Sequence, residues 1–249
     1  MPTSQVRIAD ACRVASRFLF FRATREELLR LDSKWEYAAF GIALTWIVGV
    51  GRWWDHDDTN VFQLLGLGSL VYVFALSLYL WLIIWPLRPK NWNYVRVLVC
   101  VCMTATPGLV YAIPVEWFLE PRASGHTNLG FLTFVAAWRV ALLFFFIRRL
   151  GELSWPRTIV AALLPITIIA NVISLNTLFS ISIMRGMSGV QNLTAVQLEM
   201  EKTARTVQSI AGPAFLLLGA AYIVFVYLSI RRNAKEKRPE ISREQEPTN

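Results

Sequence analysis

Charged residues are scarce in this sequence. They make up 17% of its 249 residues, whereas soluble domains carry roughly 25%. Hydrophobic residues account for 55%, and the mean hydropathy is +0.44. Such a composition, together with long apolar runs, excludes an ordinary soluble domain and predicts an integral membrane protein.

Cysteines and catalytic motifs are also scarce. Cys100 and Cys102 lie two residues apart, so on a helix they point to different faces and cannot share a metal, and with Cys12 they form no disulfide framework. The sequence has no phosphate-binding glycine loop, nucleophile elbow, HExxH or CxxC motif. Gly49-x-Gly51 and Gly66-x-Gly68 lack a third glycine and predict helix-packing positions. The sequence therefore argues against an enzyme and implies no cofactor.

Long apolar segments make up most of the sequence. Six follow the N-terminal region: Tyr37–Val50, Val61–Leu87, Val95–Val115, Leu129–Ile147, Ile159–Met184 and Ile210–Ile230. The expected fold is all-α, a polytopic bundle of six transmembrane helices that occupies residues 35–231.

The N-terminal segment, residues 1–34, is basic and amphipathic. Ile8, Cys12, Ala15 and Leu19 fall at helical spacing, which predicts a helix lying on the cytoplasmic membrane surface; a partly disordered segment is the alternative. A capping box from Thr24 to Glu27 predicts the start of a second helix.

An amphipathic pattern also precedes the last apolar segment. Glu201 and Arg205 form a favourable i,i+4 pair, and apolar residues recur at helical spacing: Leu193, Val196, Met200, Ala204, Val207 and Ala211. We expect an extracytoplasmic amphipathic helix here, with a kink at Gly212-Pro213. Residues 232–249 are charged and contain proline, so we expect a disordered cytoplasmic tail.

Lysine and arginine are distributed unevenly between the connecting segments. The segments expected on one side carry 19 of these residues, the segments on the other side carry 5, and Arg139 lies within an apolar segment. The positive-inside rule then places both termini in the cytoplasm and explains the net charge of +8 without nucleic acid. We expect an inner tryptophan belt and an outer one, formed respectively by Trp35, Trp85, Trp92, Trp155 and by Trp53, Trp54, Trp117.

Arg139 is the first candidate site, because a guanidinium stays charged even at mid-membrane. Asn171 and Ser174, on one stripe of the fifth segment, could face it, and Glu116 could join them around a cavity. The functional interpretation is a substrate-binding site for an anion or polar molecule; the structural one is that carbonyls and Asn171 satisfy Arg139, which holds the helices together. Pro107, in the third segment, could free backbone carbonyls that line a cavity or could simply kink the helix.

The outer loops supply a second candidate site. Asp55, His56 and Asp57 follow the first apolar segment, and His126, the other histidine, lies in the next outer loop. Imidazole and carboxylate form a reasonable ligand set for zinc, manganese or iron. The spacing matches no known ligand pattern, so a solvated acidic loop is the alternative.

Two functions follow from these sites. The first is a non-enzymatic membrane component, transporter-like or scaffold, in the bilayer of a bacterial inner membrane, with a membrane-protein partner or a second copy as its possible partner. The second is a membrane enzyme that uses the outer histidines and carboxylates. A polar cavity that reaches Arg139 favours the first, and convergence of His56 and His126 on a carboxylate favours the second.

Overall fold

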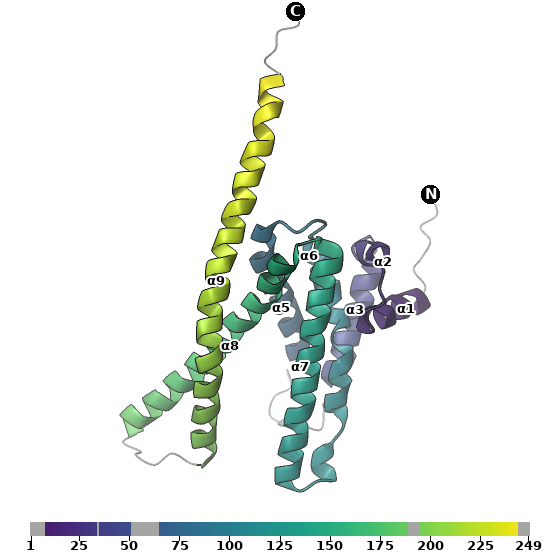
Figure 1. Cartoon of the computed structure of the whole chain (residues 1–249). Coiled ribbons are helices and arrows are strands. Elements are labelled where there is room, and N and C mark those ends of the chain that lie inside the picture. The colour runs from purple at the N-terminus through teal and green to yellow at the C-terminus, as the bar shows by residue number, and fades with distance from the viewer. Residues whose placement is uncertain (1–7, 34, 51–64, 189–194, 244–249) are drawn as a thin grey trace, which may run out of the picture. The chain divides into compact units, whose positions relative to one another are not determined.

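The computed structural model describes residues 8–33, 35–50, 65–188 and 195–243. The structure is 86% helical, with no strand in these ranges. Its elements are α1 (Ile8–Leu19), α2 (Arg25–Leu29), α3 (Trp35–Val50), α5 (Leu67–Ile84), η2 (Trp85–Leu87), α6 (Tyr94–Met103), η3 (Thr106–Ala112), η4 (Val115–Trp117), α7 (Pro121–Gly151), α8 (Trp155–Ser188) and α9 (Ala195–Arg243) (Figure 1). They divide into two units, Met1–Ser154 and Trp155–Asn249, each described by itself.

Four helices are long and apolar enough to cross a membrane. They are Leu67–Leu87, His126–Gly151, Trp155–Ile183 and Gln197–Arg231. They coincide with the second, fourth, fifth and sixth apolar segments of the sequence. The first and third segments form the shorter apolar helices Trp35–Val50 and Tyr94–Val110. The chain therefore has the architecture of a helical membrane protein.

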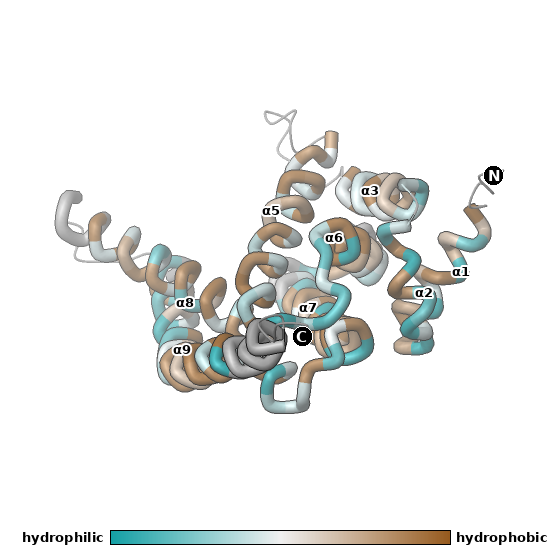
Figure 2. The backbone as a smooth tube through the Cα atoms, turned by 90° about the horizontal axis from the view of Figure 1, so that it is seen from above, coloured by the Kyte–Doolittle hydropathy of each residue, from teal (hydrophilic) through white to brown (hydrophobic). Residues whose placement is uncertain are grey.

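The centre of the first unit is α6. This helix and η3, which follows it, contact α3, α5 and α7, as the view along the helices shows (Figure 2). All residues from Val97 to Met103 are buried. Helix α3 approaches α6 so closely that a Cβ added to Gly41 would lie 2.8 Å from the Cβ of Cys102. A Cβ added to Gly49 would lie 2.7 Å from the hydroxyl of Ser69 in α5, which confirms Gly49 as a helix-packing position.

Helix α1 is present, but a different face of it is buried. The buried residues are Ala11, Val14, Ala15 and Phe18, whereas Ile8 and Cys12, two residues of the predicted apolar stripe, are exposed. The ring of Phe18 packs against those of Phe145 and Phe146 in α7, and these aromatic contacts select the face. Its apolar face therefore packs on protein.

The capping box of α2 is confirmed. The backbone N–H of Glu27 donates to the hydroxyl of Thr24 over 3.3 Å, and the backbone N–H of Thr24 donates to the Glu27 carboxylate over 2.8 Å. This reciprocal pair satisfies two N–H groups that helix formation leaves free.

Three basic segments of the first unit meet at one end of it. The Glu152 carboxylate, just after α7, forms ion pairs with Arg25 of α2 and with Lys90, the latter at 2.9 Å. Arg96 at the start of α6 pairs with Asp32 at 2.9 Å. The hydrogen bond from Lys90, together with the nearby Arg25 charge, lowers the pKa of Glu152 despite some desolvation. The segments that the positive-inside rule groups together thus share one end, called here the basic end.

The second unit consists of α8 packed on α9. The amphipathic stretch and the last apolar segment form one continuous helix. Of the predicted apolar stripe, Ala204 and Ala211 are buried, whereas Met200 and Val207 are exposed. Small side chains let two helices approach closely within a membrane, whereas large apolar side chains lose nothing by facing lipid. The pair between Glu201 and Arg205 is confirmed, at 2.8 Å.

Helix α9 also continues to Arg243, into the tail that we expected to be disordered. Extending an existing helix avoids the cost of nucleation, and this stretch is rich in lysine, arginine and glutamate, which are good helix formers. The helix passes through Pro213 without ending there.

Candidate functional site

Arg139 lies at the centre of a spanning helix. It is thirteen residues after His126 and twelve before Gly151, the two ends of the apolar span in α7. At a rise of about 1.5 Å per residue, the distance to either end is roughly 18–20 Å. The residue is half-buried. If this helix crosses a membrane, its charge lies at the depth where the hydrocarbon offers no hydrogen-bond partner.

A break between α6 and η3 lies next to this arginine. Helix α6 ends at Met103, and the chain continues as a 3₁₀ helix with Pro107 in its first turn. Because proline has no N–H, it cannot donate to the Met103 carbonyl in an α-helical pattern or to the Thr104 carbonyl in a 3₁₀ pattern. The freed carbonyls lie inside the bundle and need other donors.

Two side chains supply those donors. The Thr106 hydroxyl donates to the Met103 carbonyl over 3.3 Å. The Nε–H of Arg139 donates to the Thr104 carbonyl over 3.0 Å. Arg139 therefore completes the hydrogen bonding of a helix that Pro107 interrupts, which is part of the structural role expected from the sequence.

The other side of the guanidinium has no such partner among the residues that the structure describes. Among the described residues, Arg139 makes no other hydrogen bond and no ion pair. The N–H groups of its two η nitrogens form a planar fork that matches the oxygens of a carboxylate or phosphate. The Nε side of the Arg139 guanidinium is thus held by the Thr104 carbonyl, and the two η nitrogens keep N–H groups that can bind such oxygens.

The second unit holds a separate polar centre. The Asn171 amide donates to the carbonyls of Thr167 and Ala211 over 2.7 and 2.9 Å, and its oxygen accepts from the Gln208 amide over 2.9 Å. Ser174, one turn further along α8, is 3% exposed. Asn171 thus joins α8 to α9 with all its polar atoms engaged. That it or Ser174 faces Arg139 stays a prediction.

Gln208 is the residue that the sequence reasoning missed. Its oxygen is buried without a hydrogen-bond partner among the described residues. It lies on one helical stripe with the buried residues Glu201, Ala204 and Ala211. That stripe of small and polar residues was visible in the sequence as a possible packing face for a membrane helix.

The outer candidates are only partly visible. Asp55, His56 and Asp57 lie outside the described residues, and of Glu116, in η4, only the backbone is described. His126 is exposed in the first part of α7. Within the described ranges, no group of three or more metal-ligating residues comes together. The metal site stays a prediction.

Comparison with other proteins adds no analogue, since no protein-family model, curated protein or solved structure matches this chain. Function must therefore be inferred from the chemistry of its own residues. The half-partnered guanidinium of Arg139 is the most specific chemistry in the described structure.

Proposed function

We propose that the chain is a non-enzymatic membrane component, transporter-like in character, in which Arg139 binds an anionic or strongly polar group near mid-membrane. The observation that carries this proposal is the half-partnered guanidinium: Nε is anchored on the Thr104 carbonyl, and the η nitrogens have no partner among the described residues. A scaffold role, in which a partner helix supplies the acceptor, uses the same chemistry.

The energy of the site supports a ligand. An arginine at the centre of a membrane helix costs at least ~2.5–3.5 kcal/mol, and a hydrogen bond to a charged group contributes about 1.5–3 kcal/mol. A neutral donor could cap the Thr104 carbonyl without that cost. An anion bound to the η nitrogens would interact with the positive charge itself, which a neutral donor would not offer.

Six spans and cytoplasmic termini form part of the proposal. Helix α3 has 16 residues and measures about 24 Å, somewhat less than the ~30 Å hydrocarbon core. Helix α6 with η3 measures about 29 Å, because a 3₁₀ helix rises about 2 Å per residue. The basic end then faces the cytoplasm under the positive-inside rule, in a bacterial inner membrane.

The test compares anion responses of the purified full chain. Thermal stability in detergent is measured with acetate, succinate and inorganic phosphate for the parent, Arg139→Leu and the control Lys202→Leu, which removes an exposed charge. We expect at least one anion to stabilise the parent and the control but not Arg139→Leu, since a ligand stabilises only the form that binds it. Flux of that anion into proteoliposomes then separates transport from scaffolding. Equal responses in all three proteins would remove the proposed site.

A further inference from the structure

Helix α1 ends in a corner with a fixed backbone. Phe21 has a φ of +59°, in the left-handed region that bulky residues rarely adopt. The N–H of Arg22 donates to the Arg17 carbonyl over 2.7 Å, and the N–H of Phe21 donates to the Phe18 carbonyl over 3.0 Å. This pair of bonds is the Schellman arrangement that usually has glycine at the left-handed position.

Phe21 occupies that position because its side chain holds the corner on α7. Its ring centroid lies 6.2 Å from that of Trp138 and 5.8 Å from that of Phe145. The Trp138 indole also donates to the Leu19 carbonyl at the end of α1, over 3.2 Å. Glycine would relieve the backbone but lose both ring contacts. The corner is therefore a rigid part of the first unit.

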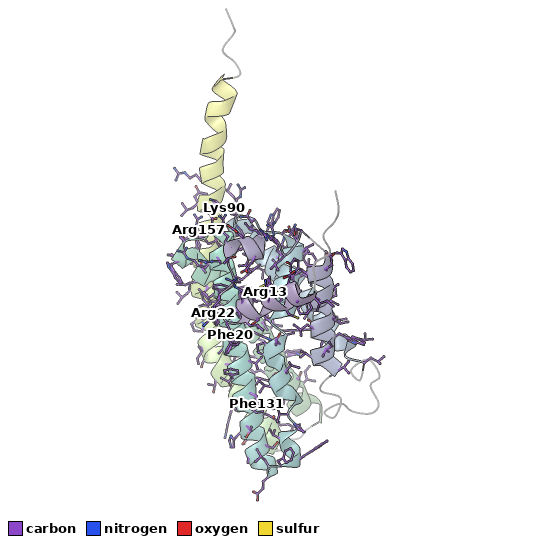
Figure 3. The ribbon with its side chains drawn as sticks, turned by 90° about the vertical axis from the view of Figure 1, so that its right-hand side faces the viewer. Arg13, Phe20, Arg22, Lys90, Phe131 and Arg157 are labelled. Atoms are coloured by element: carbon purple, nitrogen blue, oxygen red, sulfur yellow. The ribbon has the colours of Figure 1, made fainter. Side chains whose placement is uncertain are left out.

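The corner extends from near the basic end toward the middle of α7, because Phe21 contacts both Phe145 and Trp138. Phe145 is three residues before Arg148 at the basic end, and Trp138 is ten residues before it. Helix α1 runs across the direction of α7 (Figure 1). Figure 3 shows Arg13, Arg22 and Phe20 on the face toward the viewer. Of these three residues, Phe20 lies nearest to Phe131 and farthest from Lys90. This order, with basic groups toward the surface and an aromatic ring toward the hydrocarbon, is typical of an interfacial helix.

Two of the arginines on this corner are available for a ligand. Arg17 is engaged by the Glu27 carboxylate at 3.0 Å. Within the described ranges, Arg13 has only a 3.7 Å contact with Asp10, and both side chains are largely exposed. The Arg22 guanidinium makes no ion pair or hydrogen bond with the described residues, although its backbone is fixed on both sides by Arg17.

We propose that Arg13, Arg22 and Phe20 form a binding site for the headgroup phosphate of an acidic phospholipid in the leaflet at the basic end. The guanidinium groups contact the phosphate, and the Phe20 ring, 61% exposed, lies against the first part of the acyl chains. Because the corner is rigid, little order is lost when the lipid binds. This proposal requires the membrane location but is independent of any ligand at Arg139.

The test measures lipid retention by the full chain. Native mass spectrometry in detergent follows titration with phosphatidylglycerol or phosphatidylcholine, for the parent, R13Q/R22Q and the control R88Q/R149Q. The control removes the same charge from exposed positions at the basic end. We expect the parent to prefer phosphatidylglycerol and R13Q/R22Q to bind it about tenfold more weakly, with the control close to the parent.

Four results would overturn the proposal. Equal losses in both double variants would indicate diffuse charge attraction, and no preference for phosphatidylglycerol would remove the acidic headgroup. Displacement of the lipid by inorganic phosphate at equal concentration would indicate a site for free phosphate. Phe20→Ala provides a second measurement if R13Q/R22Q does not fold: it keeps both cations and should weaken phosphatidylglycerol but not glycerol-phosphate binding. Unchanged lipid binding by Phe20→Ala would also contradict the proposal.

Discussion

Pro107 and Arg139 should be thermodynamically coupled, although they lie on different helices. Arg139 donates to the carbonyl that Pro107 leaves without a 3₁₀ partner, that of Thr104. In Pro107→Ala, the new N–H at position 107 can donate to this carbonyl instead. The effect of Arg139→Leu on the free energy of unfolding should therefore depend on the residue at position 107.

The magnitude follows from the groups involved. With Pro107 present, Arg139→Leu leaves the Thr104 carbonyl unsatisfied, at a cost of about 1–3 kcal/mol. The same change removes a mid-membrane charge that costs ~2.5–3.5 kcal/mol. The free energy of unfolding of the single variant should therefore be close to that of the parent or higher. With Ala at position 107, the Thr104 carbonyl still accepts from the N–H of residue 107 after Arg139→Leu. Only the stabilisation from removing the mid-membrane charge then remains. The coupling energy should thus be about 1–3 kcal/mol, the cost of the lost acceptor.

The assay is a double-mutant cycle on the unfolding free energy, measured by reversible denaturant titration in mixed micelles. A matched cycle uses Pro114→Ala, which lies in the same segment but beyond the break. We expect coupling in the Pro107 cycle and additivity in the Pro114 cycle. Additive effects in the Pro107 cycle would refute the hydrogen-bonding role assigned to Arg139.

Three further outcomes are expected. Lys90 and Arg25 lower the pKa of Glu152 in the folded state. The ionised carboxylate therefore stabilises the fold fully above the unfolded-state pKa of about 4.3, and this stabilisation is lost as the pH falls through the folded-state pKa. The stability difference between parent and Glu152→Gln should shrink in acid during a pH series of thermal melts, and a constant difference would contradict this. Gly41→Val should destabilise by about 1–3 kcal/mol through its clash with Cys102, and a second change, Cys102→Gly, should recover part of the loss; an unchanged melting temperature for Gly41→Val would contradict the close packing. A C-terminal reporter that is active only outside the cytoplasm should stay silent, and its activity would reverse the proposed topology.

The sequence was informative about positions along the chain. The apolar segments predicted the four long helices, and the central place of Arg139 and the break at Pro107 could both be recognised. Their pairing could not be predicted, because it joins positions 35 residues apart through tertiary packing. Hydrophobic periodicity located the helices but not the partner of a freed carbonyl.

The packed faces of helices were predicted less well, for a physical reason. In water, large apolar residues mark the face that packs on protein, but in lipid they are equally stable when exposed. Thus Met200 and Val207 are exposed in α9, whereas Ala204 and Gln208 lie on the stripe that faces α8. On α1, the contact of Phe18 with α7 selected a face one position away from the expected one.

The break after α6 also bears on what could drive transport. Unwound carbonyls in transporter helices commonly coordinate a sodium ion, whose gradient then powers the movement of the substrate. Here the Thr106 hydroxyl occupies the Met103 carbonyl, and a fixed guanidinium occupies that of Thr104 and repels any cation nearby. The Arg139 guanidinium thus places a fixed positive charge where a sodium ion would otherwise bind. If the proposed site at Arg139 binds a transported substrate, that substrate should move without sodium coupled through these two oxygens.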